Sequence, residues 1–171
     1  GKWDSGKYNL VVADNYALAI EDDYVKVDGL QVSVSTAGAT IIAGIQYDNI
    51  GYLSNSIIRC TLGGSSSQLY GLILGGTGAV SIWNNIIYGF KQGANGIGFL
   101  SNSAGAIGYV YNNTSYGNNI GFSRNSGTVT LKNNIAQNCG TGGCYNGIGG
   151  SSDYNLSDIV GDAPGSHSKN G

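Results

Sequence analysis

The sequence predicts an all-β fold, a parallel β-solenoid of about six coils with three short strands in each coil. A short pattern of an aliphatic residue, a variable residue and two asparagines recurs at residues 82–86, 110–114 and 131–135. Weaker copies lie at residues 53–57 and 154–156, and a looser copy lies at residues 27–30. The copies in the centre of the chain are 21 to 29 residues apart, a period that is typical of stacked repeat architectures.

A second repeated pattern supports the same fold. A turn-forming residue, an aliphatic residue, a spacer and usually a large apolar residue recur at residues 44–47, 71–74, 96–99, 119–122 and 147–149. A third strand is indicated where residues 78–82 and 127–131 lead into the asparagine pairs. With 30 glycines, one proline and no Gly-x-y period, the composition implies many tight turns and excludes collagen. Each coil then advances the chain by one strand spacing, about 4.8 Å, so that successive coils pair as parallel strands.

The chain forms one domain, residues 1–171, with three parts. Residues 1–23 are a lead-in segment with short strands expected at residues 8–12 and 16–20. Residues 24–157 are the repeat coils, which begin with alternating apolar and polar residues over 24–34. Residues 158–171 lack the period and are predicted to be an irregular tail. Polar loops at residues 35–38, 63–67, 91–94 and 123–127 occupy corresponding places in the repeat, where solenoids often make contacts.

The paired asparagines are predicted to form an internal ladder at one corner of the solenoid. A sharp corner leaves backbone groups without partners in the sheet, and stacked side-chain amides can bond both to those groups and to each other. Glycosylation sequons begin at three of these asparagines, and we interpret them as coincidental because ladder side chains should be buried. The predicted ladder residues are Asn55, Asn84, Asn85, Asn112, Asn113, Asn133, Asn134 and Asn155.

With these asparagine pairs and the Gly-Ile pattern, residues 24–157 resemble a right-handed parallel β-helix of the pectate lyase-like superfamily. The superfamily includes polysaccharide lyases, glycoside hydrolases, phage tailspikes and non-catalytic surface modules, so the resemblance implies a fold and leaves the activity open. Its lyases typically bind calcium through acidic side chains and use an arginine or a lysine as base. Its hydrolases use clustered aspartates.

The charge distribution favours a non-catalytic protein, with a polysaccharide lyase as the alternative. Residues 49–152 contain no aspartate or glutamate, whereas glycoside hydrolysis generally uses two carboxyl groups about 5–10 Å apart. The single histidine, His167, lies in the predicted tail, which argues against a zinc site and against nucleophile–histidine pairs. The residues available as a lyase base, which we interpret as scattered solubilising charges, are Arg59, Lys91, Arg124 and Lys132.

The acidic residues of the first coils are the candidates for a metal site. Glu21, Asp22, Asp23 and Asp28 lie at a turn and in the neighbouring coil, where they could hold calcium or form a solvated acidic turn. No other cofactor is predicted.

The cysteines leave two alternatives open. Cys139 and Cys144 flank four residues and could close a disulfide in an oxidising compartment. Alternatively, both remain reduced, as we expect for Cys60, which would pack as a small apolar residue.

The candidates for carbohydrate contact are aromatic. Trp83 and Tyr111 each precede an asparagine pair and should point outward in one column, and Tyr88 and Tyr116 form a similar column four residues after the first asparagine. Aromatic side chains also favour strands for packing alone.

The expected partners follow from the surface and from the ends of the solenoid. Solenoid end coils expose strand edges, and the sequence predicts no capping helix to cover them. We therefore expect an extracellular or cell-surface module with a structural or adhesive role, whose partners are polysaccharide or cell-surface glycan and, at the end coils, copies of itself or a longer solenoid. The few basic residues of the centre are too sparse for nucleic acid, and no apolar run is long enough to span a membrane.

Overall fold

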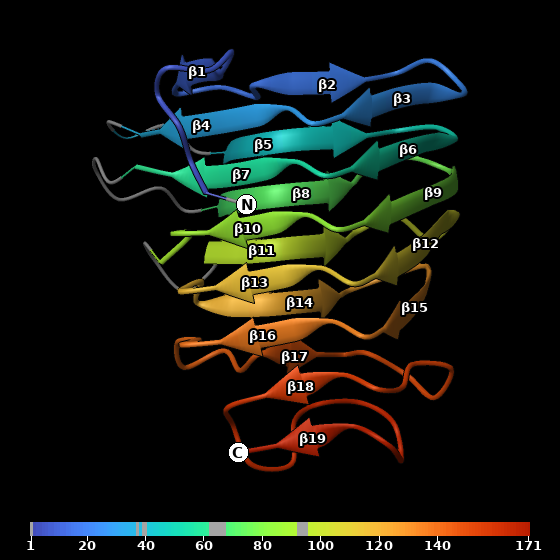
Figure 1. Ribbon diagram of the computed structural model, residues 1–171. Helices are drawn as coiled ribbons and strands as arrows, with labels where there is room; N and C mark the ends of the chain where they lie inside the picture. The colour runs from blue at the N-terminus through green and yellow to red at the C-terminus, as the bar shows by residue number, and fades with distance from the viewer. Residues whose placement is uncertain (1, 37, 39–40, 62–67, 92–95) are drawn as a thin grey trace.

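The computed structural model describes residues 2–36, 38, 41–61, 68–91 and 96–171 of the chain. Over these residues it forms a β-solenoid of three parallel sheets with no helix (Figure 1). The all-β class, the parallel stacking and the three strands per coil are therefore confirmed. Accordingly, the described residues contain no helix long and apolar enough to cross a membrane.

The three sheets are named here A, B and C. Sheet A contains, in spatial order, β1 (Leu10–Ala13), β4 (Gln31–Ser35), β7 (Ile57–Cys60), β10 (Ile86–Tyr88), β13 (Thr114–Tyr116), β16 (Ile135–Gln137), β18 (Leu156–Ser157) and β19 (Lys169–Asn170). Sheet B contains β2 (Leu18–Ile20), β5 (Ile41–Tyr47), β8 (Gln68–Leu74), β11 (Gly96–Ser101), β14 (Ile120–Arg124) and β17 (Tyr145–Asn146). Sheet C contains β3 (Val25–Asp28), β6 (Gly51–Ser54), β9 (Gly78–Trp83), β12 (Ala106–Tyr111) and β15 (Thr128–Lys132).

The chain passes through the sheets in the order A, B, C and then begins the next coil. Because sheet C has five strands among the described residues, the solenoid completes four turns from the first of them to the last, fewer than the six coils expected. Beyond β15, the place of a sheet C strand is taken by a single bridge between Lys132 and Asp153. The last coils are therefore incomplete.

Stacked apolar side chains fill the interior. Ile45, Leu72, Phe99 and Phe122 are successive register partners in sheet B and are fully buried. Tyr145, rather than the expected Ile148, continues this column, and its ring stacks on that of Phe122 with the centroids 5.3 Å apart. Burying each such side chain contributes about 1.5–3 kcal/mol, so the column is a main source of stability.

The register of sheet B differs from the predicted one by two residues. The pattern aligned Ile97 with Leu72, whereas the structure pairs Phe99 with Leu72. The reason is a column of glycines that face the neighbouring coil: a Cβ on Gly71 would lie 2.5 Å from the carbonyl oxygen of Gly98. Both Gly96 and Gly98 precede an apolar residue, so the sequence pattern did not distinguish between the two registers.

The two ends of the chain are more ordered than the predicted segments. The lead-in segment supplies β1 and β2, close to the two strands expected there. The predicted irregular tail contains β19, which pairs with β18 in sheet A. The predicted loop at residues 63–67, and residues 37 and 92–94 of two further loops, lie outside the described residues.

Candidate functional site

The corner between sheets C and A is built by the first asparagine of each pair. Asn55, Asn84, Asn112 and Asn133 have φ angles between 53° and 59° and are exposed. Asparagine tolerates this left-handed backbone conformation better than most residues do. The corner therefore presents a column of side-chain amides to solvent, contrary to the expectation that all the asparagines are internal.

The second asparagine of each pair forms the buried ladder. Asn85 Nδ2 donates to Asn113 Oδ1 at 2.9 Å, and Asn113 Nδ2 donates to Asn134 Oδ1 at 3.1 Å. Each Oδ1 also accepts from the backbone N–H of the preceding coil, as from Asn85 at 2.9 Å. The predicted ladder of eight residues is thus an inner column of Asn85, Asn113, Asn134 and Asn155 beside an outer, exposed one. Of the three sequon asparagines, only Asn112 is exposed.

The solvent side of sheet A, called here the sheet A face, begins directly after this corner. The inward positions Val32, Ile58 and Ile87 are buried, so the residues that alternate with them face outward. The outward positions form two columns, Gln31, Ile57, Ile86, Thr114 and Ile135 in one and Ser33, Arg59, Tyr88, Tyr116 and Gln137 in the other. The face therefore combines aliphatic and aromatic side chains beside the exposed amides of the corner.

Two of the four predicted contact residues lie together on this face. Tyr88 and Tyr116 are register partners on the neighbouring strands β10 and β13, and the Tyr116 side chain is 51% exposed. They line a depression of about 320 Å³. Its other lining residues are Cys60, Gly89, Lys91, Gly117 and Asn138. An apolar platform therefore lies beside an ammonium group and an amide.

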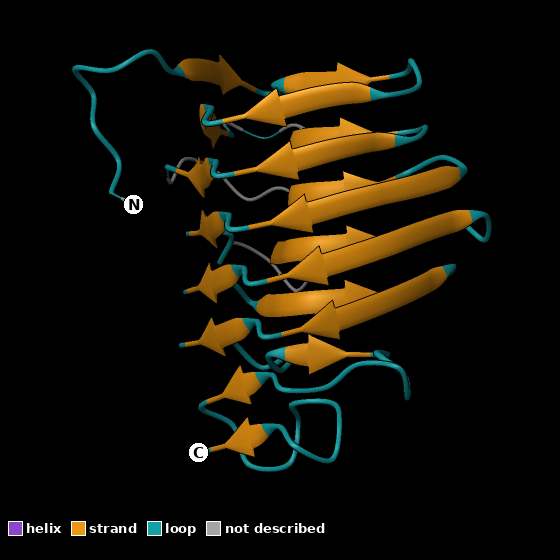
Figure 2. Cartoon of the chain, turned by 45° about the vertical axis from the view of Figure 1, so that its right-hand side comes forward, coloured by secondary structure: helices purple, strands orange, loops and turns teal. Residues whose placement is uncertain are grey.

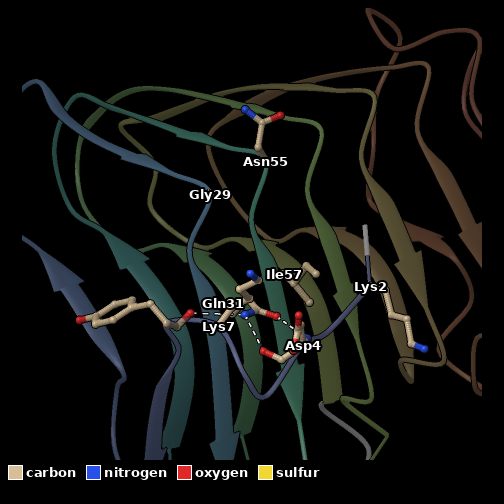
Figure 3. Close-up of a pocket in the computed structure, with 8 residues that line it drawn as sticks. Lys2, Asp4, Lys7, Gly29, Gln31, Asn55 and Ile57 are labelled. Carbon is tan, nitrogen blue, oxygen red and sulfur yellow. Dashed lines mark hydrogen bonds between the residues drawn. The ribbon is translucent and has the colours of Figure 1, made fainter.

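The N-terminal strap, residues 2–8, covers the other end of the sheet A face. Its backbone runs outside the stack of strands before the chain enters β1 (Figure 2). The backbone N–H of Asp4 donates to Gln31 Oε1 at 2.7 Å, and the Arg59 guanidinium lies 3.6 Å from the centre of the Trp3 ring. An open pocket of about 450 Å³ lies between strap and sheet, and Lys2, Lys7 and Ile57 also contribute to its lining (Figure 3).

The other two predicted contact residues lie on a different sheet. Trp83 and Tyr111 are register partners on β9 and β12, as their column predicts, but both belong to sheet C and both are partly buried. The ring contact of Trp83 is with Tyr52, edge to face with centroids 6.4 Å apart. The corner separates this pair from Tyr88 and Tyr116, so the four aromatic residues do not form one surface.

The acidic candidates for calcium are not brought together. Glu21, Asp22 and Asp23 are exposed at the turn after β2, and Asp23 accepts a hydrogen bond from the backbone N–H of Ile50. Asp28 accepts from Ser54 Oγ at 2.6 Å and from Asn55 at 2.7 Å, bonds that lower the pKa of its carboxyl. No three of the four acids place ligand atoms within 4.8 Å of one another. Asp28 therefore acts as the hydrogen-bond acceptor for the exposed amide of Asn55.

The four basic candidates are also dispersed. Arg59 packs on Trp3, and Arg124 donates to the carbonyl oxygen of Gly147 at 2.7 Å. Lys132 is exposed on sheet C, and Lys91 lines the tyrosine depression. In the described part of the chain, the ion pair is between His167 and Asp153 and includes none of the four basic candidates. The structure therefore gives these bases no carboxylate partner there.

Sequence reasoning missed one cluster at the C-terminal end. His167 Nδ1 lies 2.6 Å from Asp153 Oδ2, and the imidazole stacks on Tyr154. Their sequence separation and the missing period of the tail gave no signal for this contact. Cys139 and Cys144 form the disulfide that was one of the two alternatives.

Cys60 is the free cysteine of the chain and lies at the edge of the tyrosine depression. Its thiol is buried, and burial raises its pKa to about 11. It is therefore protonated and unreactive at neutral pH, in agreement with a packing role.

Comparison with protein-family models, with curated proteins and with solved structures gives no match to this chain.

Proposed function

We propose that this protein is a non-catalytic carbohydrate-binding module of the extracellular space or the cell surface, with an adhesive role. The observation that carries the proposal is the pair of tyrosines, Tyr88 and Tyr116, which are register partners and line a depression of the sheet A face. Aromatic rings provide flat apolar area at a low entropy cost, and the C–H faces of sugar rings pack on such platforms. Lys91 and Asn138 supply the convergent polar groups that fix a ligand's orientation.

The corner amides extend this surface. A hollow of about 350 Å³ is lined by Asn55, Asn84, Ile57, Ile86 and Ser56, so exposed amides lie beside aliphatic side chains there as well. A glycan that follows the coils would meet amide donors and acceptors and apolar contacts in alternation. The binding surface we propose therefore runs along the solenoid axis from the strap towards Tyr116.

A binding role is favoured over catalysis by the side chains that line the depression. None of its lining residues is a carboxylate that could act as acid, base or metal ligand. Membership in the pectate lyase-like superfamily, among its non-catalytic modules, is part of the proposal and is supported by the parallel solenoid and its asparagine corner. An extracellular location is supported by the disulfide, since disulfides persist in oxidising compartments.

The test is binding to a panel of polysaccharides, with Tyr116→Ala as the variant and Tyr109→Ala as its matched control. Tyr109 is also exposed, at 41%, but lies on sheet C. We expect Tyr116→Ala to weaken glycan binding about tenfold or more, or about 1.4 kcal/mol, and Tyr109→Ala to leave it unchanged. Equal binding by both variants, or no binding by the wild-type chain, would overturn the proposal. Release of unsaturated sugars would favour the polysaccharide lyase instead.

End-to-end assembly is a second candidate function, favoured by the N-terminal coil. Strands β1, β2 and β3 are the end strands of their three sheets, and Tyr8, Val11 and Tyr24 are between 63% and 83% exposed there. Unpaired strand edges with apolar side chains favour pairing with another chain. We propose a second copy of this solenoid as the partner at this end.

The test of assembly is light scattering over a range of protein concentrations, combined with negative-stain imaging. We expect oligomers or filaments that Val11→Lys dissociates, because an exposed charge at an edge strand disfavours pairing. A monomer at every concentration would exclude assembly. Glycan binding by that monomer would leave the first proposal standing.

A further inference from the structure

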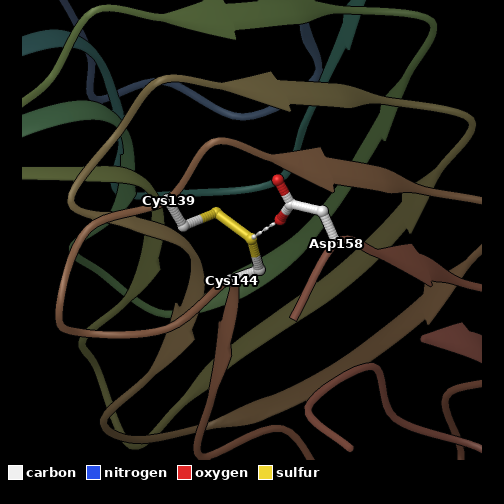
Figure 4. A group of neighbouring side chains, drawn as sticks. All are labelled: Cys139, Cys144 and Asp158. Carbon is white, nitrogen blue, oxygen red and sulfur yellow. Dashed lines mark hydrogen bonds between the residues drawn. A yellow bond between two sulfur atoms is a disulfide. The ribbon is translucent and has the colours of Figure 1, made fainter. Parts of the chain in front are cut away.

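Three potential metal ligands meet at the C-terminal end of the solenoid. Cys139 and Cys144 lie in the loop between β16 and β17, and Asp158 follows β18 (Figure 4). The two sulfur atoms and a carboxylate oxygen of Asp158 all lie within 4.8 Å of one another. The described residues contain no other such group of three histidine, cysteine or acidic side chains.

The Asp158 carboxylate is held in place against the sulfur of Cys144. Its Oδ1 lies 3.4 Å from Cys144 Sγ, and its Oδ2 accepts a hydrogen bond from the backbone N–H of Asn138 at 2.7 Å. A sulfur atom in a disulfide carries no proton, so it cannot donate a hydrogen bond to this carboxylate. The contact becomes favourable only when a proton or a cation lies between the two atoms.

A second carboxylate, that of Asp162, is bound to the backbone of Cys144. Asp162 Oδ2 accepts from the backbone N–H of Cys144 at 2.7 Å, while its Oδ1 is buried without a hydrogen-bond partner among the described residues. The ion pair of the described chain, between His167 and Asp153, does not include either carboxylate. The negative charge of Asp158 and Asp162 favours a bound cation nearby.

We propose that the reduced form of this cysteine pair, together with Asp158, is a binding site for a thiolate-preferring divalent cation, Zn²⁺. Two thiolates, one carboxylate oxygen and one water complete the four-coordinate shell that zinc prefers. The Cα atoms of the two cysteines are 5.3 Å apart, so the reduced side chains can place both sulfurs on one ion. Calcium and magnesium do not suit this site, because these ions bind to oxygen donors and two of the three donor atoms are sulfur.

The disulfide and the bound metal exclude each other, because both use the same two sulfur atoms, and the site is therefore redox-gated. A thiol reductant supplies two electrons, the S–S bond breaks, each sulfur takes a proton, and the reductant is oxidised to its own disulfide. Zinc then displaces the two thiol protons and binds the thiolates. A small-molecule disulfide then oxidises the pair: it accepts two electrons and is reduced to two thiols, the S–S bond re-forms, and the ion is released. The oxidised chain accordingly has no thiolate to offer there.

The test is a zinc titration of the full-length chain against a chromogenic chelator, with and without a phosphine reductant, while circular dichroism monitors the fold. We expect one equivalent of zinc to bind to the reduced chain and none to the oxidised chain. Asp158→Asn should weaken binding at least tenfold, and Cys144→Ser should abolish it. Cys60→Ser and His167→Gln are the controls and should bind as the wild-type chain does.

Three results would overturn the proposal. The first is absence of zinc binding by a reduced, folded chain, and the second is equal affinity in Asp158→Asn. The third is loss of the fold on reduction that added zinc does not reverse. Because the readout is metal binding, failure of this site leaves glycan binding by Tyr116 as a separate question.

Discussion

At the scale of single residues, the two adjacent asparagines of each pair have different structural roles. Asn112 turns the backbone at the corner and is exposed, whereas Asn113 is buried and has hydrogen-bond partners in both neighbouring coils. The difference arises because the first residue takes the left-handed conformation, which directs the next side chain into the interior. The pair is therefore one structural unit with two separable roles.

Replacement of Asn113 by alanine should destabilise the solenoid by about 3 kcal/mol, because it leaves the backbone N–H and the amide of Asn85 without their shared acceptor. Asn112→Gly is the matched control and should change stability by less than about 0.5 kcal/mol, since glycine adopts positive φ freely. Urea unfolding of both variants measures the difference. Equal effects at the two positions would show that the ladder is not the stabilising element.

The glycine column makes a second prediction at this scale. A Cβ on Gly98 would lie 2.7 Å from the carbonyl oxygen of Gly121, so Gly98→Ala should cost about 1–3 kcal/mol through overpacking. Gly150→Ala is the control, because nothing lies within 4 Å of the position of its Cβ. Thermal unfolding should show a lower Tm for the first variant alone.

At the scale of elements, the C-terminal tail acts as a cap. Ser168 Oγ accepts a hydrogen bond from the backbone N–H of Asn155 at 2.9 Å, where the next ladder asparagine would otherwise stand. The Asn155 amide also donates to the carbonyl oxygen of Pro164, and β19 pairs with β18. The tail thus satisfies the last rung of the ladder, which leaves the N-terminal coil as the less covered end.

The contact between His167 and Asp153 should make this cap dependent on pH. The hydrogen bond from His167 is the largest of the effects that lower the pKa of the Asp153 carboxyl. A carboxyl with a lowered folded pKa stabilises the fold above its unfolded pKa and loses that contribution as pH falls through the folded value. His167→Ala should therefore lower the Tm at pH 7. The difference in Tm between this variant and the wild-type chain should disappear as the pH falls below about 4.

Differential scanning calorimetry from pH 7 down to pH 2 tests this dependence. Asp153→Asn is the control, because it removes the titrating group and should make the effect of His167→Ala independent of pH over the same range. A gap that persists undiminished at low pH would assign His167 a packing role only, through its stacking on Tyr154.

At the scale of the whole molecule, stability comes from contacts between coils. Every strand pair in the described part of the three sheets is parallel and joins segments of successive coils, so none of these strands is stabilised by a local hairpin. Cys60 lies inside this stack, at the end of β7, and is almost completely buried. Its exposure therefore requires neighbouring coils to separate.

Alkylation of Cys60 should consequently report the opening of the solenoid. Raising the thiol pKa from 9.0 to about 11 lowers the thiolate fraction at pH 8 about a hundredfold, and burial adds to this protection. Native chain should react at least about a hundredfold more slowly than chain unfolded in urea. Cys60→Ser provides the blank, because the disulfide leaves no other free thiol. Rapid alkylation of the native chain would contradict the packing of this coil.

The asparagine pairs and their period were sufficient to predict the parallel solenoid, its three strands per coil and the corner. Each repeat meets nearly the same environment as the last, so a local pattern carries the same structural meaning along the chain. The pairing of Trp83 with Tyr111 and of Tyr88 with Tyr116 on neighbouring strands also followed from the period and agrees with the observed register.

The tertiary structure alone decided which of these columns share a surface. Trp83 and Tyr88 are five residues apart, but the left-handed corner at Asn84 places them on different sheets. The register of sheet B depended on which glycine faces the backbone carbonyl of the next coil. Cys144 and Asp158, the proposed metal ligands, lie together only because the chain after β18 passes next to the loop that precedes β17. Periodicity determines what stacks along the axis, whereas contacts across corners and between non-equivalent segments depend on the path of the backbone in three dimensions.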